Sequence, residues 1–147
     1  MSTPFPRTAV IDDGRLIQIG GVAVAELGHQ HGTPLYVVDE AELVGRMREY
    51  REAFGAAADV AYASKALCVT GVLQLAAREG LHVDVASRGE LHTAVRAGFP
   101  MERVIHHGNN KELDELRDAV ELGVGRIVVD SLSELRRGPG RPRGEAH

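Results

Sequence analysis

One lysine stands where an apolar, strand-like run gives way to a helix-like pattern. The run "VAYA" (60–63) is followed by Ser64 and Lys65, and the segment after them has the apolar spacing of a helix. A lysine amine can attack a carbonyl carbon and form a Schiff base, so Lys65 is a candidate for covalent catalysis. The structural alternative is a solvated charge in the first turn of a helix, although a cation is mildly unfavourable at that end.

Other polar residues follow similar strand-like runs. Asp84 and Ser87 follow the second run, the segment "HHGNNK" (106–111) follows the third, and Asp130 follows the fourth. In a parallel α/β protein these strand ends meet on one face, where binding and catalysis normally take place. Strand parity puts Ala61, Ala63 and Lys65 on one side, and small residues beside a lysine leave space for a flat ligand.

The elements that must position these residues alternate along the chain. Strand-like runs are expected at 59–64, 81–87, 103–108 and 126–131, with a further one at 34–39. Helical patterns are expected at 40–54, 66–80, 87–100 and 111–125, with a short one from Ser131. Alternation with short loops predicts an α/β fold with a parallel sheet, either a (β/α) barrel or a doubly wound sheet. A leucine-rich solenoid lacks its signature here, and the Gly-rich cluster at 138–144 follows no strand, so it is no phosphate loop.

Several residues near the strand ends have structural interpretations. Ser87 with Glu90, and Ser131 with Glu134, have the spacing of capping boxes, which favours a structural role for Glu90 over a direct role in a site. Gly80 and Gly98 are expected to end their helices. For Asn109 and Asn110, a role as caps of the next helix is as good an interpretation as a role in the site.

Composition restricts the class of protein. The 147 residues carry a net charge of −4, which argues against a general nucleic-acid binder. The single cysteine, Cys68, excludes an internal disulfide and is expected to be a buried thiol on a helix. The seven histidines show no metal-site spacing, so no metal is expected. There is no signal-peptide pattern or apolar run of membrane-spanning length, and we expect a cytoplasmic protein without a membrane partner.

Several motifs together resemble one enzyme group. The segment "YASKALCVTGVLQLAAREG" (62–80) resembles the pyridoxal-phosphate attachment segment of the ornithine/diaminopimelate/arginine decarboxylase group. "DVASRGEL" (84–91) is similar to that group's D-x-x-S-x-G-E-L stretch, and "GTPLYVVDE" (32–40) to its entry strand. "HGNNK" (107–111) with "GVGRIVVDS" (123–131) most resembles the diaminopimelate branch.

The resemblance implies a fold, a cofactor and a set of site residues. The fold is a partial alanine-racemase-like (β/α)8 TIM barrel of the fold-type III pyridoxal-phosphate enzymes, with about the first half of the barrel present. The cofactor is pyridoxal 5′-phosphate, held as a Schiff base by the catalytic Lys65. Asp84 would lie beside the lysine and the cofactor, and His107 would line the cofactor pocket.

The implied function is amino-acid decarboxylation, in the diaminopimelate branch the conversion of meso-2,6-diaminopimelate to L-lysine and CO2 in lysine biosynthesis. The substrate is then a small amino acid, and the full-length family members are expected to be homodimers with active sites at the subunit interface. Two alternatives stay open. One is a decarboxylase for ornithine, arginine or carboxynorspermidine, and the other is a non-catalytic partial barrel that binds a partner.

The same resemblance predicts the domain organisation. Residues 1–31 correspond to a segment that in relatives pairs with a C-terminal β domain, and residues 32–136 to a partial barrel. The strand-like part at 14–27 is expected to expose unpaired edges and apolar surface. Residues 137–147 are rich in Pro, Gly and Arg and are expected to be disordered. Because a complete barrel takes about 250 residues, the chain is expected to be truncated and inactive by itself.

Overall fold

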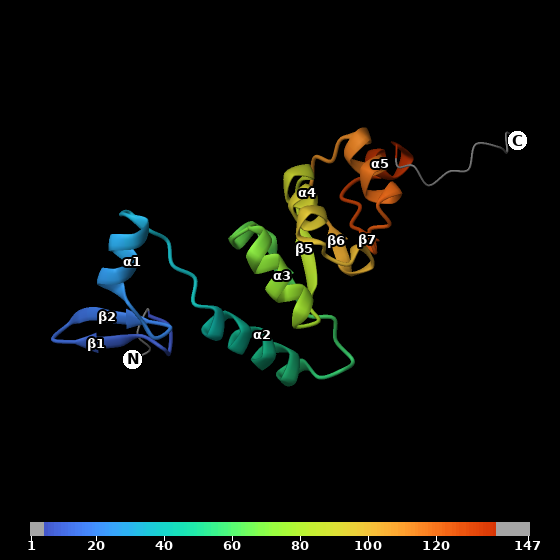
Figure 1. Ribbon diagram of the computed structural model, residues 1–147. Helices are drawn as coiled ribbons and strands as arrows, with labels where there is room; N and C mark the ends of the chain where they lie inside the picture. The colour runs from blue at the N-terminus through green and yellow to red at the C-terminus, as the bar shows by residue number, and fades with distance from the viewer. Residues whose placement is uncertain (1–4, 138–147) are drawn as a thin grey trace, which may run out of the picture. The chain divides into compact units, whose positions relative to one another are not determined.

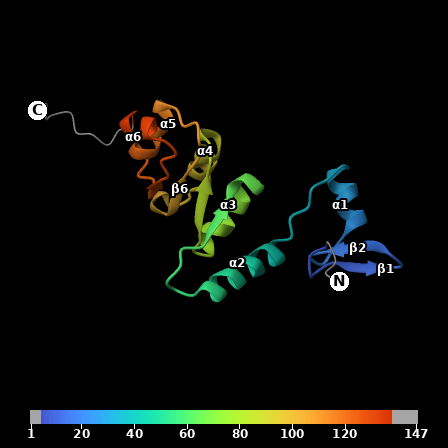
Figure 2. The same cartoon turned by 180° about the vertical axis from the view of Figure 1, so that it is seen from behind.

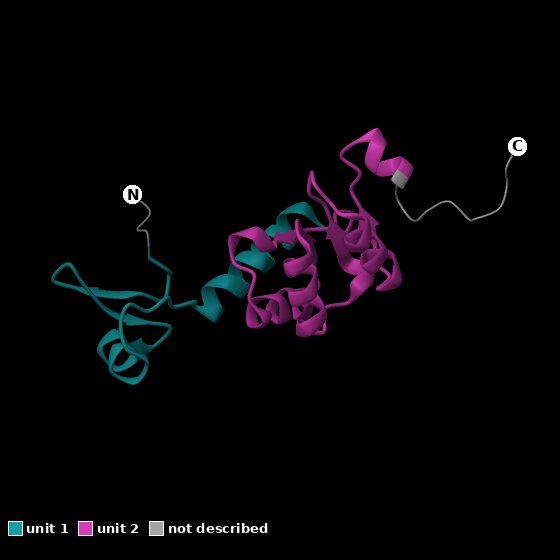
Figure 3. Ribbon diagram, turned by 90° about the horizontal axis from the view of Figure 1, so that it is seen from above, with its two compact units in different colours: residues 1–55 teal, residues 56–147 magenta. Residues whose placement is uncertain are grey.

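The chain forms two compact units, which are coloured separately in Figure 3. The computed structural model describes residues 5–137; unit 1 comprises residues 1–55 and unit 2 residues 56–147. The tail predicted at 137–147 therefore lies almost entirely outside the described residues. Among the described helices, none combines the length and the apolar character that crossing a membrane requires.

Unit 1 begins with a small antiparallel sheet. Its strands are β1 (Val10–Asp12), β2 (Arg15–Ile19) and β3 (Val22–Ala23), in the order β1-β2-β3. Two tight turns join them, and Asp13-Gly14 and Gly20-Gly21 all have positive φ, as the hairpin turns favoured by strand twist require. The strand-like pattern at 14–27 therefore contains β2 and β3, and β2 is the central strand of the sheet, paired with β1 on one side and β3 on the other. The last residues of the pattern differ from the prediction because they begin a helix, α1 (Val24–His31).

The second helix of unit 1 matches its predicted range, whereas the strand expected before it does not form. Helix α2 (Glu40–Phe54) begins after Asp39, whose carboxylate accepts a 2.9 Å hydrogen bond from the Glu42 N–H and another from the Thr8 hydroxyl. These bonds favour the ionised carboxylate and lower the pKa of Asp39. The strand predicted at 34–39 is wrong for this structure, because no neighbouring strand pairs with the segment among the described residues. The side chain of Tyr36 is fully exposed there.

Unit 2 is built on a parallel sheet. Its strands are β4 (Ala61–Ala63), β5 (His82–Val85), β6 (Val104–His106) and β7 (Arg126–Ile127). They lie in the order β4-β5-β6-β7, each parallel to the next. Sequential order without a reversal is the order of a barrel, whereas a doubly wound sheet changes direction at a switch point. The order therefore resolves the choice left open by the alternating pattern.

A helix follows each strand of this sheet, as Figures 1 and 2 show from opposite sides. The α-helices are α3 (Thr70–Arg78), α4 (Arg88–Ala97), α5 (Leu113–Glu121) and α6 (Leu132–Arg137), and the 3-10 turns are η1 (Ser64–Ala66) and η2 (Met101–Arg103). Val83, Val85 and Val104 are fully buried, whereas their strand neighbours Asp84 and Ile105 are partly exposed. One face of the sheet thus packs under apolar helix residues, which include Leu73, Ala76, Leu91, Ala94, Leu116 and Ala119.

Three local predictions in unit 2 need correction. Helix α3 begins at Thr70 rather than at 66, because η1 and an extended stretch at 67–69 come first. Cys68 lies in this stretch, half-buried and off the helix, and is not the buried helical thiol that we expected. Asn109 and Asn110 do not cap α5, since the residue before that helix is Glu112 and it makes no side-chain capping bond.

A buried polar pair joins β6 to α5. His106 is completely buried, and its Nε2 atom lies 3.0 Å from Oε1 of Glu115, which is itself 8% exposed. If Nε2 donates to the carboxylate, Nδ1 carries a lone pair, which fits the absence of a partner for this atom among the described residues. Burial disfavours the imidazolium and lowers the pKa of His106 below its usual 6.5, although the bond to Glu115 acts in the opposite direction.

This pair predicts a loss of stability in mild acid. A folded-state pKa below the unfolded one means that the unfolded chain binds more protons as the pH falls below about 6.5. The stability contributed by neutral His106 is therefore present above that pH and decreases below it, by at most about 1.4 kcal/mol per pH unit. We expect His106→Gln to reduce the difference in urea-unfolding free energy between pH 7.5 and pH 5.5. His92→Gln, which removes an exposed histidine of α4, is the matched control, and an unchanged pH dependence in His106→Gln contradicts the prediction.

Gly125 predicts a second effect on stability. A Cβ atom at this position would lie 2.0 Å from the carbonyl oxygen of Glu102, which is backbone and cannot rotate away. We expect Gly125→Ala to destabilise unit 2 by about 1–3 kcal/mol in thermal or urea unfolding followed by circular dichroism. The control is Gly71→Ala in α3, where nothing lies within 4 Å of the new atom and helix propensity improves. Equal stability of the two variants would show that the loop at Gly125 adapts.

Candidate cofactor site

Lys65 lies directly after β4, in the turn η1. The turn is fixed by its neighbour Ser64, which is completely buried. The Ser64 hydroxyl oxygen lies 2.8 Å from the carbonyl oxygen of Asp84 and 2.8 Å from Oε2 of Glu90, so its single proton is shared between two acceptors. The Lys65 side chain is exposed. The fold thus presents the amine on an anchored backbone at the carboxyl end of the sheet.

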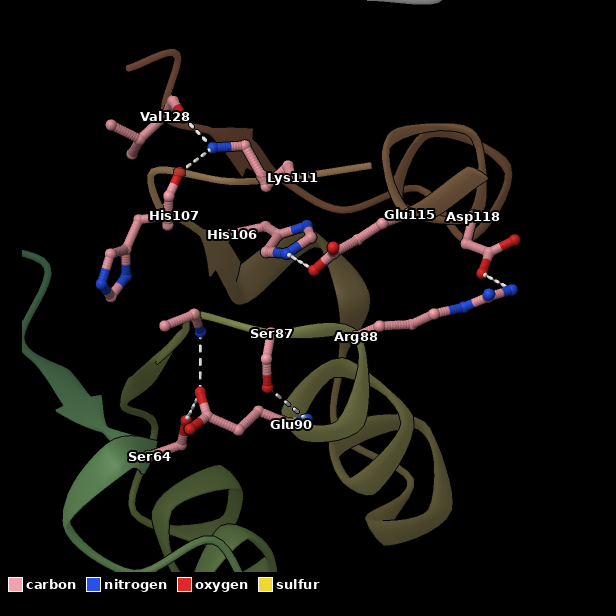
Figure 4. Close-up of polar contacts among 12 residues, drawn as sticks. Ser64, Ser87, Arg88, Glu90, His106, His107, Lys111, Glu115, Asp118 and Val128 are labelled. Atoms are coloured by element: carbon pink, nitrogen blue, oxygen red, sulfur yellow. Dashed lines mark hydrogen bonds and ion pairs between the residues drawn. The ribbon is translucent and has the colours of Figure 1, made fainter. Parts of the chain in front are cut away.

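Glu90 connects this turn to the start of α4, as Figure 4 shows. Its Oε2 atom accepts the backbone N–H of Ala86 at 2.7 Å as well as the Ser64 hydroxyl. Its own N–H donates to the hydroxyl of Ser87, the N-cap residue, at 3.3 Å. The capping box is therefore confirmed, except that the Glu90 carboxylate accepts the N–H of Ala86, the residue before the N-cap, and not that of Ser87 itself. The part played by Ser64 was not predicted from the sequence, since its partner Glu90 lies 26 residues further along the chain.

Asp84 and His107 are in direct side-chain contact. Asp84 lies beside Ala63 and Ile105 in the parallel ladder, and its Oδ1 atom hydrogen-bonds Nδ1 of His107. The side chain of Asp84 is 26% exposed and that of His107 is 32% exposed. An ionised carboxylate only accepts, so the Nδ1 atom carries the proton and Nε2 is left to interact with a ligand.

Two backbone features bring His107 to this position. Its N–H donates to the Val85 carbonyl at 2.8 Å, which extends the parallel pairing one residue past β6. The next residue, Gly108, has a φ of +118°, and a Cβ atom there would lie 2.7 Å from the Ala86 carbonyl oxygen. Only glycine fits so close to the neighbouring strand end. The close approach therefore depends on Gly108.

Lys111 is the second amine of the region and the opposite of Lys65 in exposure. Its side chain is 1% exposed, and Nζ lies 2.8 Å from Oε1 of Glu134, which is 5% exposed. Nζ also donates to the carbonyl oxygens of Val128, at 2.8 Å, and Gly108. Glu134 belongs to the second capping box, which is confirmed by a 3.1 Å bond from its N–H to the Ser131 hydroxyl. The sequence placed Lys111 in a motif without showing this role.

The strand ends together supply the groups that an aldehyde cofactor needs. Lys65 is an accessible amine, and Asp84 with His107 forms a carboxylate–imidazole pair at the same edge of the sheet. The carbonyl of Asp84 contacts Ser64, which connects the lysine turn to that pair. Ala61 and Ala63 lie beside His82 and Asp84 in the ladder and add little bulk. These residues fit pyridoxal phosphate chemically. Metal ligands, by contrast, do not gather in any group of three among residues 5–137.

Comparison with known protein families identifies the larger part of the chain. Residues 40–137 match the model described as the pyridoxal binding domain of the pyridoxal-dependent decarboxylases. The chain is 44% identical over 133 residues to a diaminopimelate decarboxylase of Mycobacterium tuberculosis, covering 90% of this chain and 30% of the relative. It is 51% identical over 122 residues to the diaminopimelate decarboxylase of Bacillus subtilis, covering 81% of this chain and 28% of the relative.

Solved structures agree with this similarity. The diaminopimelate decarboxylase of M. jannaschii, in complex with L-lysine, superposes with a TM-score of 0.81 at 35% identity over 89% of this chain and 32% of that one. A lysine/ornithine decarboxylase of Vibrio vulnificus, in complex with putrescine, gives a TM-score of 0.69 at 27% identity over 78% and 31%. These neighbours confirm the partial alanine-racemase-like barrel expected from the sequence.

The match is to the N-terminal part of these enzymes, as predicted. The chain spans about 30% of the length of the curated relatives that it matches. The family model alone covers more than half of the chain, and the motifs around Lys65 and Asp84 lie inside the matched range. This chain therefore belongs to the family of pyridoxal-dependent decarboxylases, with sequence of their pyridoxal-binding domain over residues 40–137.

Proposed function

We propose that this chain carries the cofactor-attachment part of a pyridoxal-phosphate-dependent amino-acid decarboxylase, with Lys65 as the residue that binds the cofactor aldehyde. The observation that supports this most is the contrast between the two lysines of the sequence. Lys65 is exposed at the carboxyl end of β4, whereas Lys111 is buried in an ion pair. An accessible amine on an anchored turn is the one that can react with a carbonyl.

The other residues of the site support the lysine. When bound, pyridoxal phosphate supplies an electron sink for the charge left on the substrate's α-carbon as CO2 departs. Asp84 holds the imidazole of His107 with the proton on Nδ1, so that Nε2 faces a ligand as an acceptor or, when protonated, as a donor. Ser64 and Glu90 keep the turn that carries Lys65 in place. We assign cofactor contact to Lys65, Asp84 and His107.

The substrate that we propose for the full-length protein is meso-2,6-diaminopimelate, with L-lysine and CO2 as products. The named relatives at 44–51% identity support this substrate, as does the "HGNNK" motif. Another basic amino acid is the second candidate substrate, because one structural neighbour is named as a lysine/ornithine decarboxylase. The complete reaction and homodimer formation are assigned to the full-length protein, and the domain boundary at residue 31 stays a prediction.

A non-catalytic role has one observation in its favour. Large apolar side chains are exposed around the end of β7 and along α6, namely Val128, Val129, Leu132 and Leu135, with exposures from 46% to 72%. Exposed apolar surface of this kind is typical of an interface. A partial barrel that binds a partner through this surface remains the alternative, and it predicts no selective chemistry at Lys65.

Covalent trapping tests the proposal. The chain is incubated with pyridoxal phosphate and reduced with borohydride, and the added mass is located by peptide mapping. We expect the label on the peptide that contains Lys65, and its loss in Lys65→Ala, because Lys111 is buried and paired. In urea, where both amines are accessible, both peptides should be labelled.

The two lysines make the outcomes distinct. Native labelling confined to Lys65 supports an attachment site formed by the fold. Labelling of Lys111 or of the N-terminal amine at the same rate as Lys65 contradicts it and favours the interaction role. The unfolded sample serves as the internal standard, since it gives the intrinsic reactivity of each amine within one sequence.

Ser64 provides a prediction about positioning. Ser64→Ala removes the hydroxyl that joins η1 to Glu90, which should lower the unfolding free energy by about 1–2 kcal/mol and slow the labelling of Lys65. Ser87→Ala is the matched control, because it removes the N-cap bond of α4 and should lower the unfolding free energy by a similar amount, without removing a contact of η1. The assay compares labelling rates at fixed cofactor concentration. Equal slowing in both variants would mean that Ser64 contributes stability only.

A further inference from the structure

Lys111 is a buried amine that the proposed chemistry does not use. Its Nζ atom contacts three oxygen atoms from three separate segments: Gly108 after β6, Val128 after β7, and Glu134 in α6. Figure 4 shows the ammonium group between the two backbone carbonyls. Nζ donates hydrogen bonds to the two carbonyl oxygens and forms an ion pair with the carboxylate of Glu134. The cluster therefore connects the ends of two neighbouring strands to the helix that follows them.

The contact with Gly108 bears directly on His107. The backbone on both sides of the His107–Gly108 peptide is held: the His107 N–H before it donates to the Val85 carbonyl, and the Gly108 carbonyl after it accepts from Lys111 Nζ. Gly108 itself lies against Ala86 so closely that no side chain would fit. With its backbone restrained at both ends, the His107 ring is directed at Asp84.

Stability alone is a weak reason for this arrangement. Removing a lysine and a glutamate from water is costly, and apolar residues of similar volume often serve a fold as well or better. A single charged donor can, however, bind two carbonyls and a carboxylate in one fixed geometry, which an apolar side chain cannot do. The pair thus fixes the position of the backbone carbonyl of Gly108.

We propose that Lys111 and Glu134 are a positioning pair, which holds the His107–Gly108 peptide so that His107 hydrogen-bonds Asp84 at the cofactor site. Neither residue is assigned a contact with cofactor or substrate. The inference deepens the proposed function and rests on it only for its consequence, which is tighter cofactor binding. The geometry of His107 is a property of this chain without any ligand and can be measured on its own.

The test uses the double variant Lys111→Met/Glu134→Gln. Methionine and glutamine keep the approximate volume of the two side chains, and replacing both avoids leaving one buried charge unpaired. Two controls accompany it in the full chain. Arg117→Met breaks the exposed 2.9 Å ion pair with Asp114 on α5, and Leu73→Ala lowers stability from the core of α3. Melting temperatures of all variants are recorded so that the double variant is compared with a control of similar stability.

The first readout is the tautomer of His107, from the imidazole nitrogen shifts of protein with labelled histidine at pH 8, assigned with His107→Gln. We expect the wild type and both controls to show the Nδ1–H form that the bond to Asp84 selects, and the double variant to lose this preference. The second readout is pyridoxal phosphate affinity, expected to weaken about tenfold in the double variant, which corresponds to about 1.4 kcal/mol.

Each result has a definite meaning. Loss of the tautomer preference in the double variant, but not in a control of equal stability, supports the positioning role. Retention of the preference, or its equal loss in Leu73→Ala, overturns it. If His107 behaves as expected while the wild type binds no cofactor at Lys65, the positioning inference stands and the proposed function fails.

Discussion

Two glutamates at helix starts connect the strand ends of unit 2, and the candidate site depends on them. Glu90 opens α4 and Glu134 opens α6, and each accepts the N–H of the residue before the N-cap serine, that of Ala86 or Asp130. Each also contacts a side chain that follows an earlier strand: Glu90 accepts a hydrogen bond from Ser64, and Glu134 forms an ion pair with Lys111. A capping glutamate normally serves its own helix. Here it also sets the position of the neighbouring βα unit.

Such connections matter because the strands are short. The parallel strands β4 and β6 have three residues each and β7 has two, so few ladder bonds determine where each chain leaves the sheet. Contacts with the part-buried carboxylate of Glu90 and the buried carboxylate of Glu134 supply the missing restraint. Gly108 and Gly125 complete the arrangement by allowing backbone to approach backbone more closely than any Cβ permits.

The sequence predicted the order of elements and the capping serines well, because both follow local patterns. Helix α2, the four parallel strands and both capping boxes lie where periodicity and spacing put them. The segment 34–39 has the composition of a strand, but a strand also needs a hydrogen-bonded neighbour, which composition does not supply. The hydrogen bond between Ser64 and Glu90 and the ion pair between Lys111 and Glu134 join residues that are 26 (90 − 64) and 23 (134 − 111) positions apart in the sequence. No local sequence pattern predicts contacts of this kind.

His106 and His107 show why strand parity decides function in this fold. The two residues have the same chemistry and adjacent positions, yet Figure 4 shows His106 directed at Glu115 and His107 pointing away from it. His106 lies under the helices, where burial lowers its pKa and keeps it neutral. His107 reaches the edge that the helices leave open, where Asp84 determines which nitrogen carries the proton. One residue along a strand therefore separates a histidine of the core from a histidine that can meet a ligand.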